Sequence, residues 1–401
     1  MSHPTLRAVT IVGGSLAGLR AAEALRREGF DGRLRIVSAE AELPYDRPPL
    51  SKQVLAGTWE PDRARLRGAD ELDAEWLFGR RATALDPATH AVTLDGAEVV
   101  DADAVVIATG AAPRRLPAAV APPDLGGVHV LRTIGDCLAL RAELVRGPRV
   151  AVIGAGFIGS EVAATAKGLG ADVVVIEALP VPLERALGPE MGPLAAELHR
   201  EHGVEVRLGV PVAGLEGDGA GRVARVRMAD GGAVEADVVV VGIGVAPATA
   251  WLEGSGLQLD DGVVCDARCR AAPGVVVAGD VARWYHERIG EHLRVEHWAN
   301  AAEQGDAAAR ALVHGDDALP YAPVPYFWSD QHGTKIQFVG HAKPGDAVQV
   351  VEGSVEERRF VAAYGRDGRT VAALLWNRAA RVPHWLDQLT LRVPFPPPPG
   401  P

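Results

Sequence analysis

The fold is decided by residues 149–159, which read Arg149-Val150-Ala151-Val152-Ile153-Gly154-Ala155-Gly156-Phe157-Ile158-Gly159. The apolar run 149–153 predicts a strand, and the apolar spacing after it predicts a helix from about Ile158 to Leu169. A glycine turn between them exposes backbone N–H groups at a helix N-terminus, where they favour an anionic diphosphate. The next predicted strand, 173–176, leads into Glu177. A carboxylate about 20 residues after the last glycine suits a ribose 2′-hydroxyl, so this stretch predicts a dinucleotide-binding unit.

The same layout occurs near the N-terminus. A predicted strand, 8–12, precedes a glycine-containing turn, a helix follows from Leu16, and a second strand, 34–37, leads towards Glu40. Ser15 stands where the middle glycine is expected, and a serine can serve there if its φ is negative. Two copies in one chain predict two dinucleotides. The turn residues assigned to the first diphosphate are Gly13, Gly14, Ser15 and Gly18.

Three further apolar runs, 104–110, 237–244 and 274–280, read as central strands covered on both faces. The chain from about residue 321 is aromatic and rich in β-forming residues, and it ends in a proline-rich tail, 396–401, that we expect to be disordered. The predicted fold class is α/β, with two Rossmann-like dinucleotide-binding domains and a small α+β C-terminal domain.

Composition and charge exclude several classes of function. The 401 residues carry a formal charge of −11, which argues against general nucleic-acid binding. Three cysteines can form neither a secreted disulfide framework nor a four-thiolate iron–sulfur cluster, and no His, Cys and Glu cluster has metal-ligand spacing. No signal peptide or membrane-length apolar run is found, so we expect a cytoplasmic protein with no membrane partner.

Glu177 also bears on the choice of nicotinamide cofactor. A carboxylate there repels a 2′-phosphate, and Ala178-Leu179-Pro180 supply no arginine. Arg185 is the nearest cation and is kept as a candidate contact. The sequence therefore favours NADH over NADPH.

At this point the chain resembles a family, the FAD-dependent, NAD(P)H-using ferredoxin reductases of bacterial oxygenase and cytochrome P450 systems, of the putidaredoxin reductase type. The resemblance extends over nearly the whole chain, and its most specific parts are 44–52, containing Arg-Pro-Pro-Leu-Ser-Lys, and 327–331, Phe-Trp-Ser-Asp-Gln. The other matching stretches are 13–18, 108–110, 131–133, 154–161, 279–282 and 295–300.

The resemblance implies a glutathione-reductase-like fold and roles for particular residues. Lys52 would lie beside the isoalloxazine of FAD, and Glu161 would pair with Lys52 and position the nicotinamide. Asp280 would bind the ribityl chain, and Trp298 would pack near the flavin. Ala17 would face the FAD diphosphate. The remaining positions assigned to FAD or NAD are Glu40, Arg47, Ala82, Thr109, Gly110, Arg132, Gly154, Gly156, Phe157, Ile158, Gly159, Gly244 and Gly279.

Each of these roles has a structural alternative. The alternatives are a surface lysine for Lys52, an exposed residue of a first helical turn for Glu161, a cap of the next segment for Asp280, and plain core for Trp298.

The implied domains are an FAD-binding domain of residues 1–112 and 245–320, an NAD-binding domain of 113–244, and a C-terminal domain of 321–401. The implied partner is an acidic [2Fe–2S] ferredoxin that feeds a cytochrome P450 or Rieske oxygenase, and the chain would act as a monomer or homodimer. As a set of charges, the candidate docking cations fit a solvated face better than a docking surface; they are Arg63, Arg65, Arg67, Arg80, Arg81, Arg283, Arg310 and Lys335.

The expected reaction is NADH:ferredoxin oxidoreduction, in which FAD takes a hydride from NADH and returns electrons singly. Cys265 and Cys269 stand in an irregular stretch away from the predicted flavin-facing turn, so we expect no catalytic dithiol. Two alternatives stay open: an NADH oxidase or quinone reductase of the same fold, and an apoptosis-inducing-factor-like redox sensor that binds NADH.

Overall fold

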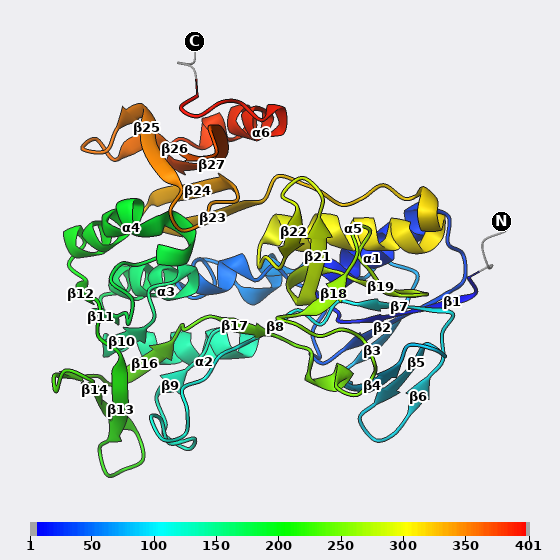
Figure 1. Cartoon of the computed structure of the whole chain (residues 1–401). Helices are drawn as coiled ribbons and strands as arrows, with labels where there is room; N and C mark the ends of the chain where they lie inside the picture. The colour runs from blue at the N-terminus through cyan, green and yellow to red at the C-terminus, as the bar shows by residue number, and fades with distance from the viewer. Residues whose placement is uncertain (1–5, 398–401) are drawn as a thin grey trace. The chain divides into compact units, whose positions relative to one another are not determined.

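The computed structural model describes residues 6–397, so residues 398–401 of the predicted proline-rich tail lie outside it. The chain divides into two compact units (Figure 1). Unit 1 comprises the chain up to Asp46, Arg65–Ala112 and Ala246–Pro325. Unit 2 comprises Arg47–Ala64, Pro113–Val245 and the chain from Tyr326 onward. Two of the boundaries between these segments, at 112/113 and 245/246, fall within the short strands β8 (Ala111–Pro113) and β17 (Val245–Pro247).

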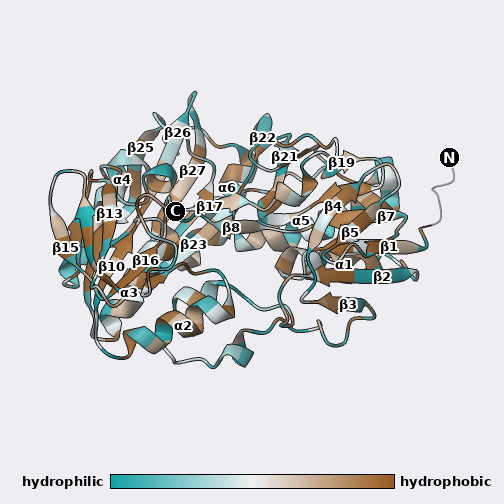
Figure 2. Cartoon of the chain, turned by 90° about the horizontal axis from the view of Figure 1, so that it is seen from below, coloured by the Kyte–Doolittle hydropathy of each residue, from teal (hydrophilic) through white to brown (hydrophobic). Residues whose placement is uncertain are grey.

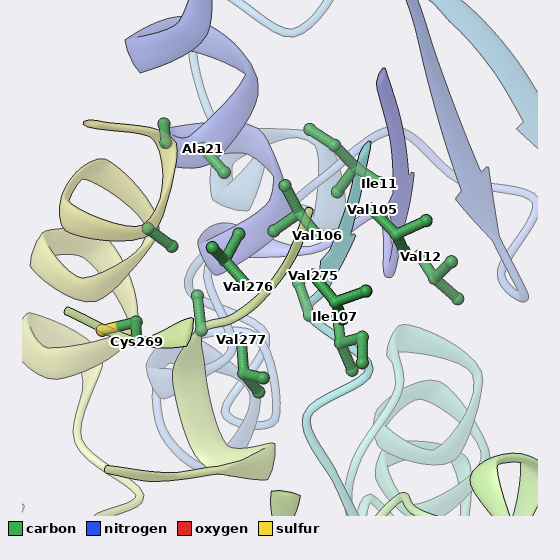
Figure 3. Packing of buried hydrophobic residues seen from close by; sticks show 14 of the residues in the cluster. Ile11, Val12, Ala21, Val105, Val106, Ile107, Cys269, Val275, Val276 and Val277 are labelled. Atoms are coloured by element: carbon green, nitrogen blue, oxygen red, sulfur yellow. The ribbon is translucent and has the colours of Figure 1, made fainter. Parts of the chain in front are cut away.

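Unit 1 is built on a six-stranded sheet in the order β19-β20-β7-β1-β2-β3. All neighbouring pairs are parallel except β19 with β20. Their runs of Val and Ile suit strands covered on both faces, and Figure 3 shows side chains such as Ile11, Val106 and Val276 packed together in this core. The strands are β1 (Ala8–Val12), β2 (Arg33–Ser38), β3 (Glu75–Phe78), β7 (Ala104–Ile107), β19 (Arg270–Ala272) and β20 (Val275–Val277).

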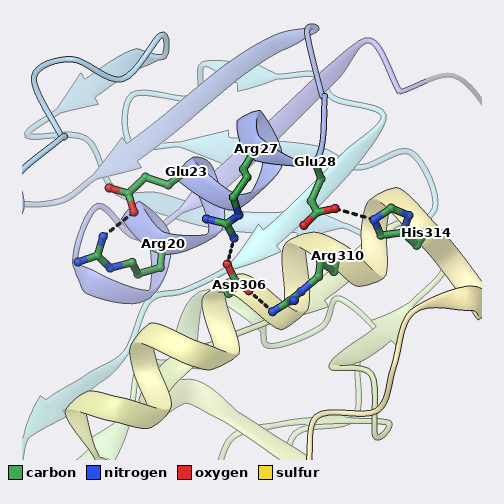
Figure 4. Close-up of polar contacts among 7 residues, drawn as sticks. All are labelled: Arg20, Glu23, Arg27, Glu28, Asp306, Arg310 and His314. Carbon is green, nitrogen blue, oxygen red and sulfur yellow. Dashed lines mark hydrogen bonds and ion pairs between the residues drawn. The ribbon is translucent and has the colours of Figure 1, made fainter.

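Two helices pack side by side in this unit, α1 (Leu16–Arg27) and α5 (Trp298–His314). Ion pairs link the two helices, as Figure 4 shows: Asp306 of α5 pairs with Arg27 of α1, and His314 of α5 lies 2.8 Å from Glu28 at the end of α1. Asp306 also pairs with Arg310 within α5. The hydrogen bond from His314 holds the pKa of Glu28 below its usual value. The smaller sheets are β4-β5-β6 (Ala82–Asp86, Ala91–Leu94, Val99–Val100) and β18-β21-β22 (Val263–Cys265, Ala282–His286, Glu291–Leu293).

Unit 2 repeats the parallel design in the order β12-β11-β10-β16-β9. Figure 2 shows apolar residues along β10 and β16, as it does along β1 and β7 of unit 1. The strands are β9 (Val128–His129), β10 (Arg149–Ile153), β11 (Asp172–Ile176), β12 (Glu205–Arg207) and β16 (Val238–Val241). The helices are α2 (Ile134–Leu144), α3 (Phe157–Gly168) and α4 (Glu184–Glu201), with a smaller sheet β13-β14-β15 (Val212–Gly217, Val223–Met228, Ala233–Glu235).

The chain from Tyr326 adds a five-stranded antiparallel sheet to unit 2, in the order β23-β24-β27-β26-β25. One face of it packs against α4, where Leu187 and Leu194 meet Phe338 and Trp376 in one buried cluster. The strands are β23 (Tyr326–Gln331), β24 (Thr334–Gly340), β25 (Ala347–Ser354), β26 (Arg359–Arg366) and β27 (Arg369–Trp376), followed by α6 (Val382–Leu391). The predicted fold class is confirmed, whereas the three domain boundaries stay a prediction.

A histidine cluster joins α4 to the turn between β23 and β24. The Nδ1 atom of His199 lies 3.0 Å from Nε2 of His332, and the ring of His202 stacks on His332. Burial, with the neighbouring imidazoles, lowers the pKa of His199 to about 3 and that of His332 to about 4. His199 is completely buried, so the folded chain holds it neutral.

We expect this cluster to make the protein sensitive to acid. In the unfolded chain His199 takes up a proton below its ordinary pKa of 6.5, but in the folded chain only near pH 3. Because the unfolded state binds more protons in that window, the contribution of His199 to the free energy of unfolding is complete above about pH 6.5. It is lost as the pH decreases below that value, by about 1.4 kcal/mol per pH unit. Melting temperatures between about pH 7.5 and 4.5 should therefore fall less steeply in His199→Leu than in wild type. The exposed-histidine control His292→Asn should keep the wild-type slope, and an unchanged slope in His199→Leu would contradict the expectation.

Candidate functional site

In the first glycine turn, in unit 1, a side chain at either of two positions would overlap backbone atoms. A Cβ on Gly13 would lie 2.1 Å from the Ala108 carbonyl oxygen, and Gly13 has φ +123°. A Cβ on Gly18 would lie 1.9 Å from the carbonyl oxygen of Gly13. Glycine at these two positions lets the first turn of α1 start directly against the end of β1.

Ser15 occupies the middle position without strain. It is the N-cap of α1 in an extended conformation, φ −111° and ψ −161°. Its counterpart in unit 2, Gly156, has the same conformation, φ −75° and ψ −177°. Because φ is negative at both residues, a serine can occupy the middle position of the first turn, as predicted from the sequence.

The carboxylate after β2 is held by a local contact. The Tyr45 hydroxyl donates a hydrogen bond to the Glu40 carboxylate, and the Ser38 hydroxyl donates to the Glu40 carbonyl oxygen at 3.0 Å. Ser38 also borders the turn, since a Cβ on Gly14 would lie 2.6 Å from the Ser38 Cβ. The end of β2, two residues before the acid expected at the ribose, thus borders the glycine turn.

Two other predicted FAD positions meet at the start of α1. Gly279, with φ +79°, begins the short helix Gly279–Val281 that carries Asp280, and a Cβ on it would lie 2.9 Å from the Cβ of Ala17. The Gly279 amide donates to Oε1 of the buried Gln304 at 2.9 Å. The structure therefore brings the segment of Asp280 to the glycine turn, although the two are far apart in sequence.

The remaining candidates of unit 1 are placed as follows. Trp298 begins α5, packs against the cluster that contains Leu16, and donates from its indole to Asp46 at 2.7 Å. The Thr109 hydroxyl donates to the Ala248 carbonyl oxygen at 2.9 Å, and Gly110 follows it with φ +69°. Ala82 begins β4 and packs against the large core.

The second glycine turn, in unit 2, has the same steric constraints. A Cβ on Gly154, where φ is +100°, would lie 2.4 Å from the Gly242 carbonyl oxygen, and one on Gly159 would lie 2.1 Å from that of Gly154. At Gly156 the nearest atom, also the Gly242 carbonyl oxygen, is 3.9 Å away. Packing therefore requires glycine at the first and third positions but not at the middle one.

Glu177 is tied to this turn by its own carboxylate. Oε2 accepts from the Ala155 amide at 2.6 Å, and Oε1 accepts from the Leu179 amide at 2.9 Å. Arg185 is exposed in the first turn of α4, and Gly244, with φ +90°, borders open space. Phe157 packs against Phe327 with ring centroids 4.7 Å apart, and the next residue, Ile158, is exposed.

Lys52 and Glu161 form an ion pair within unit 2, as predicted. The Lys52 ammonium donates to Oε2 of Glu161 at 2.8 Å, and the Glu161 residue is 5% exposed. The readings of Lys52 as a surface lysine and of Glu161 as an exposed helix residue are therefore wrong.

The segment that carries Lys52 is held in place by backbone-directed contacts. The Thr165 hydroxyl donates to the Ser51 carbonyl oxygen at 2.7 Å, and the Cys137 thiol donates to that of Leu50 at 3.2 Å. Arg47 donates to the Arg132 carbonyl oxygen at 2.5 Å, which joins two predicted FAD contacts. Pro48–Ser51 forms a short 3₁₀ turn, so Lys52 follows a segment anchored at several points.

Sequence reasoning missed two further residues at this ion pair. The Ser51 hydroxyl donates to Oε2 of Glu161 at 2.5 Å, and the Ser329 hydroxyl donates to Oε1 at 2.7 Å. Both serines lie in the most specific motif stretches, 44–52 and 327–331, and that specificity was the one signal available.

The three cysteines are free and buried. Burial raises the pKa of Cys137 to about 11 and that of Cys269 to about 12, and it raises the pKa of Cys265 as well. Thiols in this state are poor nucleophiles, in agreement with the expected lack of a catalytic dithiol. Within residues 6–397, no group of His, Cys, Asp and Glu side chains could hold a metal ion.

The candidate docking cations differ in their contacts and are divided between the two units. Four of them are paired with carboxylates nearby: Arg80 with Asp95 and Glu98, Arg283 with Asp260, Arg310 with Asp306, and Lys335 with Asp330. Arg63 lies over the ring of Trp59 in unit 2. Six of the eight belong to unit 1, and Arg63 and Lys335 belong to unit 2.

Comparison with known proteins places the chain in a family. The family model described as pyridine nucleotide-disulphide oxidoreductase matches residues 7–305, and one described as reductase C-terminal matches residues 326–387. The chain belongs to the pyridine nucleotide-disulphide oxidoreductase family. In the part of the chain that the structure describes, no helix has the length and apolar character needed to cross a membrane.

Individual relatives show which reductases the chain is similar to. The ferredoxin–NAD(+) reductase component of the anthranilate 1,2-dioxygenase system of Burkholderia cepacia is 41% identical over 374 residues, covering 92% of this chain and 90% of the relative. Putidaredoxin reductase of Pseudomonas putida is 34% identical over 398 residues, covering 97% and 93%. The crystal structure of the covalent putidaredoxin reductase–putidaredoxin complex matches with a TM-score of 0.91 at 33% identity, covering 97% and 94%. The resemblance read from the sequence motifs is confirmed.

The glycines of the second turn give a steric prediction. Gly159→Ala places a Cβ against the Gly154 backbone and should lower the melting temperature and abolish NADH binding. Gly156→Ala meets only an ordinary van der Waals contact at negative φ and should keep the wild-type melting temperature. Thermal unfolding and NADH titration of both variants provide the measurement. Equal melting temperatures for the two variants would show that close packing does not require the third glycine.

Proposed function

We propose that the chain is an NADH:ferredoxin oxidoreductase that holds FAD on the first glycine turn and NADH on the second. The observation that carries the proposal is the repeat itself. Two turns share one backbone arrangement, and each is followed by a carboxylate at the end of the next strand. The names of the relatives, ferredoxin–NAD(+) reductases of oxygenase systems and putidaredoxin reductase, support this assignment.

The residues present fit two dinucleotides. In both turns the close packing of the third glycine lets α1 and α3 begin directly at the end of the preceding strand, so the amides of the first helical turn can face a diphosphate. The Glu177 carboxylate accepts from the Ala155 amide of its turn, and Glu40 follows the strand that borders the first turn, so both are assigned to accept from ribose hydroxyls. Bound FAD would supply the redox chemistry, because it can take an electron pair from NADH and release the electrons one at a time.

The protein's own contribution is placement and charge. We assign Lys52 and Glu161 to the reacting rings. The Lys52 ammonium is held by a buried carboxylate and follows a segment anchored by Thr165 and Cys137, so a positive charge is fixed in place before any ligand arrives. Preorganised charge of this kind favours the development of negative charge nearby, without reorganisation of solvent.

Glu177 supports NADH rather than NADPH as the donor. Its two oxygens already accept from two backbone amides, which fixes a negative charge where a 2′-phosphate would lie. Arg185 is the cation nearest in sequence, in the first turn of α4.

The proposed electron acceptor is an acidic [2Fe–2S] ferredoxin that serves a cytochrome P450 or Rieske oxygenase. One of the solved structures that this chain matches is a covalent complex of putidaredoxin reductase with putidaredoxin, which supports a partner of this kind. A cytoplasmic location and a monomeric or homodimeric state belong to the same proposal and rest on sequence composition. The buried thiols weigh against an NADH oxidase that uses a peroxidatic cysteine.

Steady-state cytochrome c reduction tests the proposal. We expect NADH-dependent reduction to rise at least about tenfold when a [2Fe–2S] ferredoxin is added, and NADPH to give kcat/KM at least about tenfold lower. The control omits ferredoxin at the same enzyme concentration. Equally fast turnover with oxygen or a quinone alone, with no stimulation by any member of an acidic ferredoxin panel, would contradict it.

The ion pair gives a second test. Lys52→Met and Glu161→Gln should retain FAD but slow its reduction by NADH by about tenfold or more, because the fixed charge is lost or released. Stopped-flow absorbance at the flavin band measures the limiting rate. Lys167→Met, a lysine near the end of the same helix α3, is the matched control and should behave as wild type. Wild-type rates in both ion-pair variants would remove Lys52 and Glu161 from the reaction.

A further inference from the structure

Both oxygens of the buried Glu161 carboxylate have donors, and the donors come from two separate segments of unit 2. Oε2 accepts from Lys52 at 2.8 Å and from the Ser51 hydroxyl at 2.5 Å. Oε1 accepts from the Ser329 hydroxyl at 2.7 Å. The first two donors come from the anchored segment that follows Arg47, and the third comes from β23 of the C-terminal sheet. The carboxylate is therefore held from two sides.

Ser329 is itself fixed more firmly than a hydroxyl usually is. Its residue is completely buried, and the Gln331 side-chain amide donates to its oxygen at 3.1 Å. Because that oxygen accepts from Gln331, the single hydroxyl hydrogen is directed to Glu161. Gln331 and Ser329 lie on one face of β23, since side chains alternate along a strand.

The same face of β23 is docked against α3, the helix that carries Glu161. Phe327, two residues before Ser329, packs against Phe157 at the start of α3, with ring centroids 4.7 Å apart. Phe327 also stacks on Phe338 of the neighbouring strand. The distance between Ser329 and Glu161 is thus set by aromatic packing as well as by the hydrogen bond.

We propose that Ser329 is a positioning residue for the NADH-dependent step and that Gln331 supports it. By occupying Oε1, Ser329 fixes the carboxylate rotamer so that Oε2 faces Lys52 and Ser51. The C-terminal sheet thereby takes part in placing the Lys52 ammonium. This inference rests on the proposed function, in which Lys52 and Glu161 act on the reacting rings.

The test is the effect of Ser329→Ala on reduction of the bound flavin by NADH. The substitution leaves a buried carboxylate oxygen without its donor. We expect the limiting rate to fall about tenfold, the size of effect of one hydrogen bond to a charged group. The Kd for NADH and the flavin content, read from visible absorbance, should stay at wild-type values. A residue with a merely structural role would change binding or flavin content as well.

A double-mutant cycle isolates the pathway through Glu161. If Ser329 acts through that carboxylate, Ser329→Ala should have no further effect on rate or melting temperature in a Glu161→Ala background. Ser160→Ala is the matched control, because Ser160 lies next to Glu161 on α3 and its buried hydroxyl has no hydrogen-bond partner in the described part of the chain. It should keep the wild-type rate.

Conservative variants keep the proposal testable if Ser329→Ala does not fold. Ser329→Thr retains the hydroxyl and should recover most of the rate, whereas Ser329→Cys keeps the volume with a weak donor and should be slow. Gln331→Leu removes only the supporting donor and should slow the reaction less than Ser329→Ala.

The outcomes separate this inference from the proposed function. A wild-type rate in Ser329→Ala, with a slow rate in Glu161→Ala, would overturn the positioning role and leave the function intact. Additive losses in the double variant would also overturn it. If NADH does not reduce the wild-type flavin at all, the proposed function fails. The melting-temperature cycle then still shows whether Ser329 and Glu161 are coupled, and no coupling would overturn the inference.

Discussion

The structure depends first on the contact between a helix start and the backbone just before it. In each parallel sheet the third glycine of the turn lies so close to the carbonyl of the first that a single methyl group would overlap it. This closeness sets where α1 and α3 begin and aims their first amides at the ends of β1 and β10. A diphosphate site needs bare amides at a helix N-terminus, and the packing of helix on strand provides them before a ligand is bound.

A second constraint is the cost of burying charge. Burying a carboxylate is unfavourable unless hydrogen-bond donors replace its water of hydration. The hydration free energy that it loses is larger than one ordinary hydrogen bond supplies. Glu161 meets this condition with three donors, of which Lys52 carries the compensating charge. Since Ser51 and Ser329 lie 110 and 168 residues from Glu161, a local chemical requirement joins three distant parts of the sequence. The Lys52 segment belongs to unit 2, with Glu161 and Ser329, although the chain on both sides of it belongs to unit 1.

Periodicity and glycine spacing were enough to predict the two parallel sheets, the helix starts and the acids after β2 and β11, because each of these features is encoded locally. The pairing of Lys52 with Glu161 came from the family resemblance, since nothing in their spacing brings them together. Ser329 could not be assigned a role, because a serine in a strand has no signature of its own partner. The docking cations also show that partners distant in sequence cannot be identified from the sequence alone. Arg80, Arg283, Arg310 and Lys335 read as free charge in the sequence, but each is neutralised by a carboxylate placed by the fold.

The middle position of the two turns separates what the fold requires from what a ligand requires. Ser15 and Gly156 share an extended backbone with negative φ, which any residue adopts. At Gly156 the protein leaves a Cβ nothing nearer than 3.9 Å, so packing does not explain a glycine there. The first and third glycines are different, because a Cβ on them would overlap backbone atoms. The residue at the middle position therefore carries information about the molecule that approaches the turn, whereas its neighbours carry information about the fold.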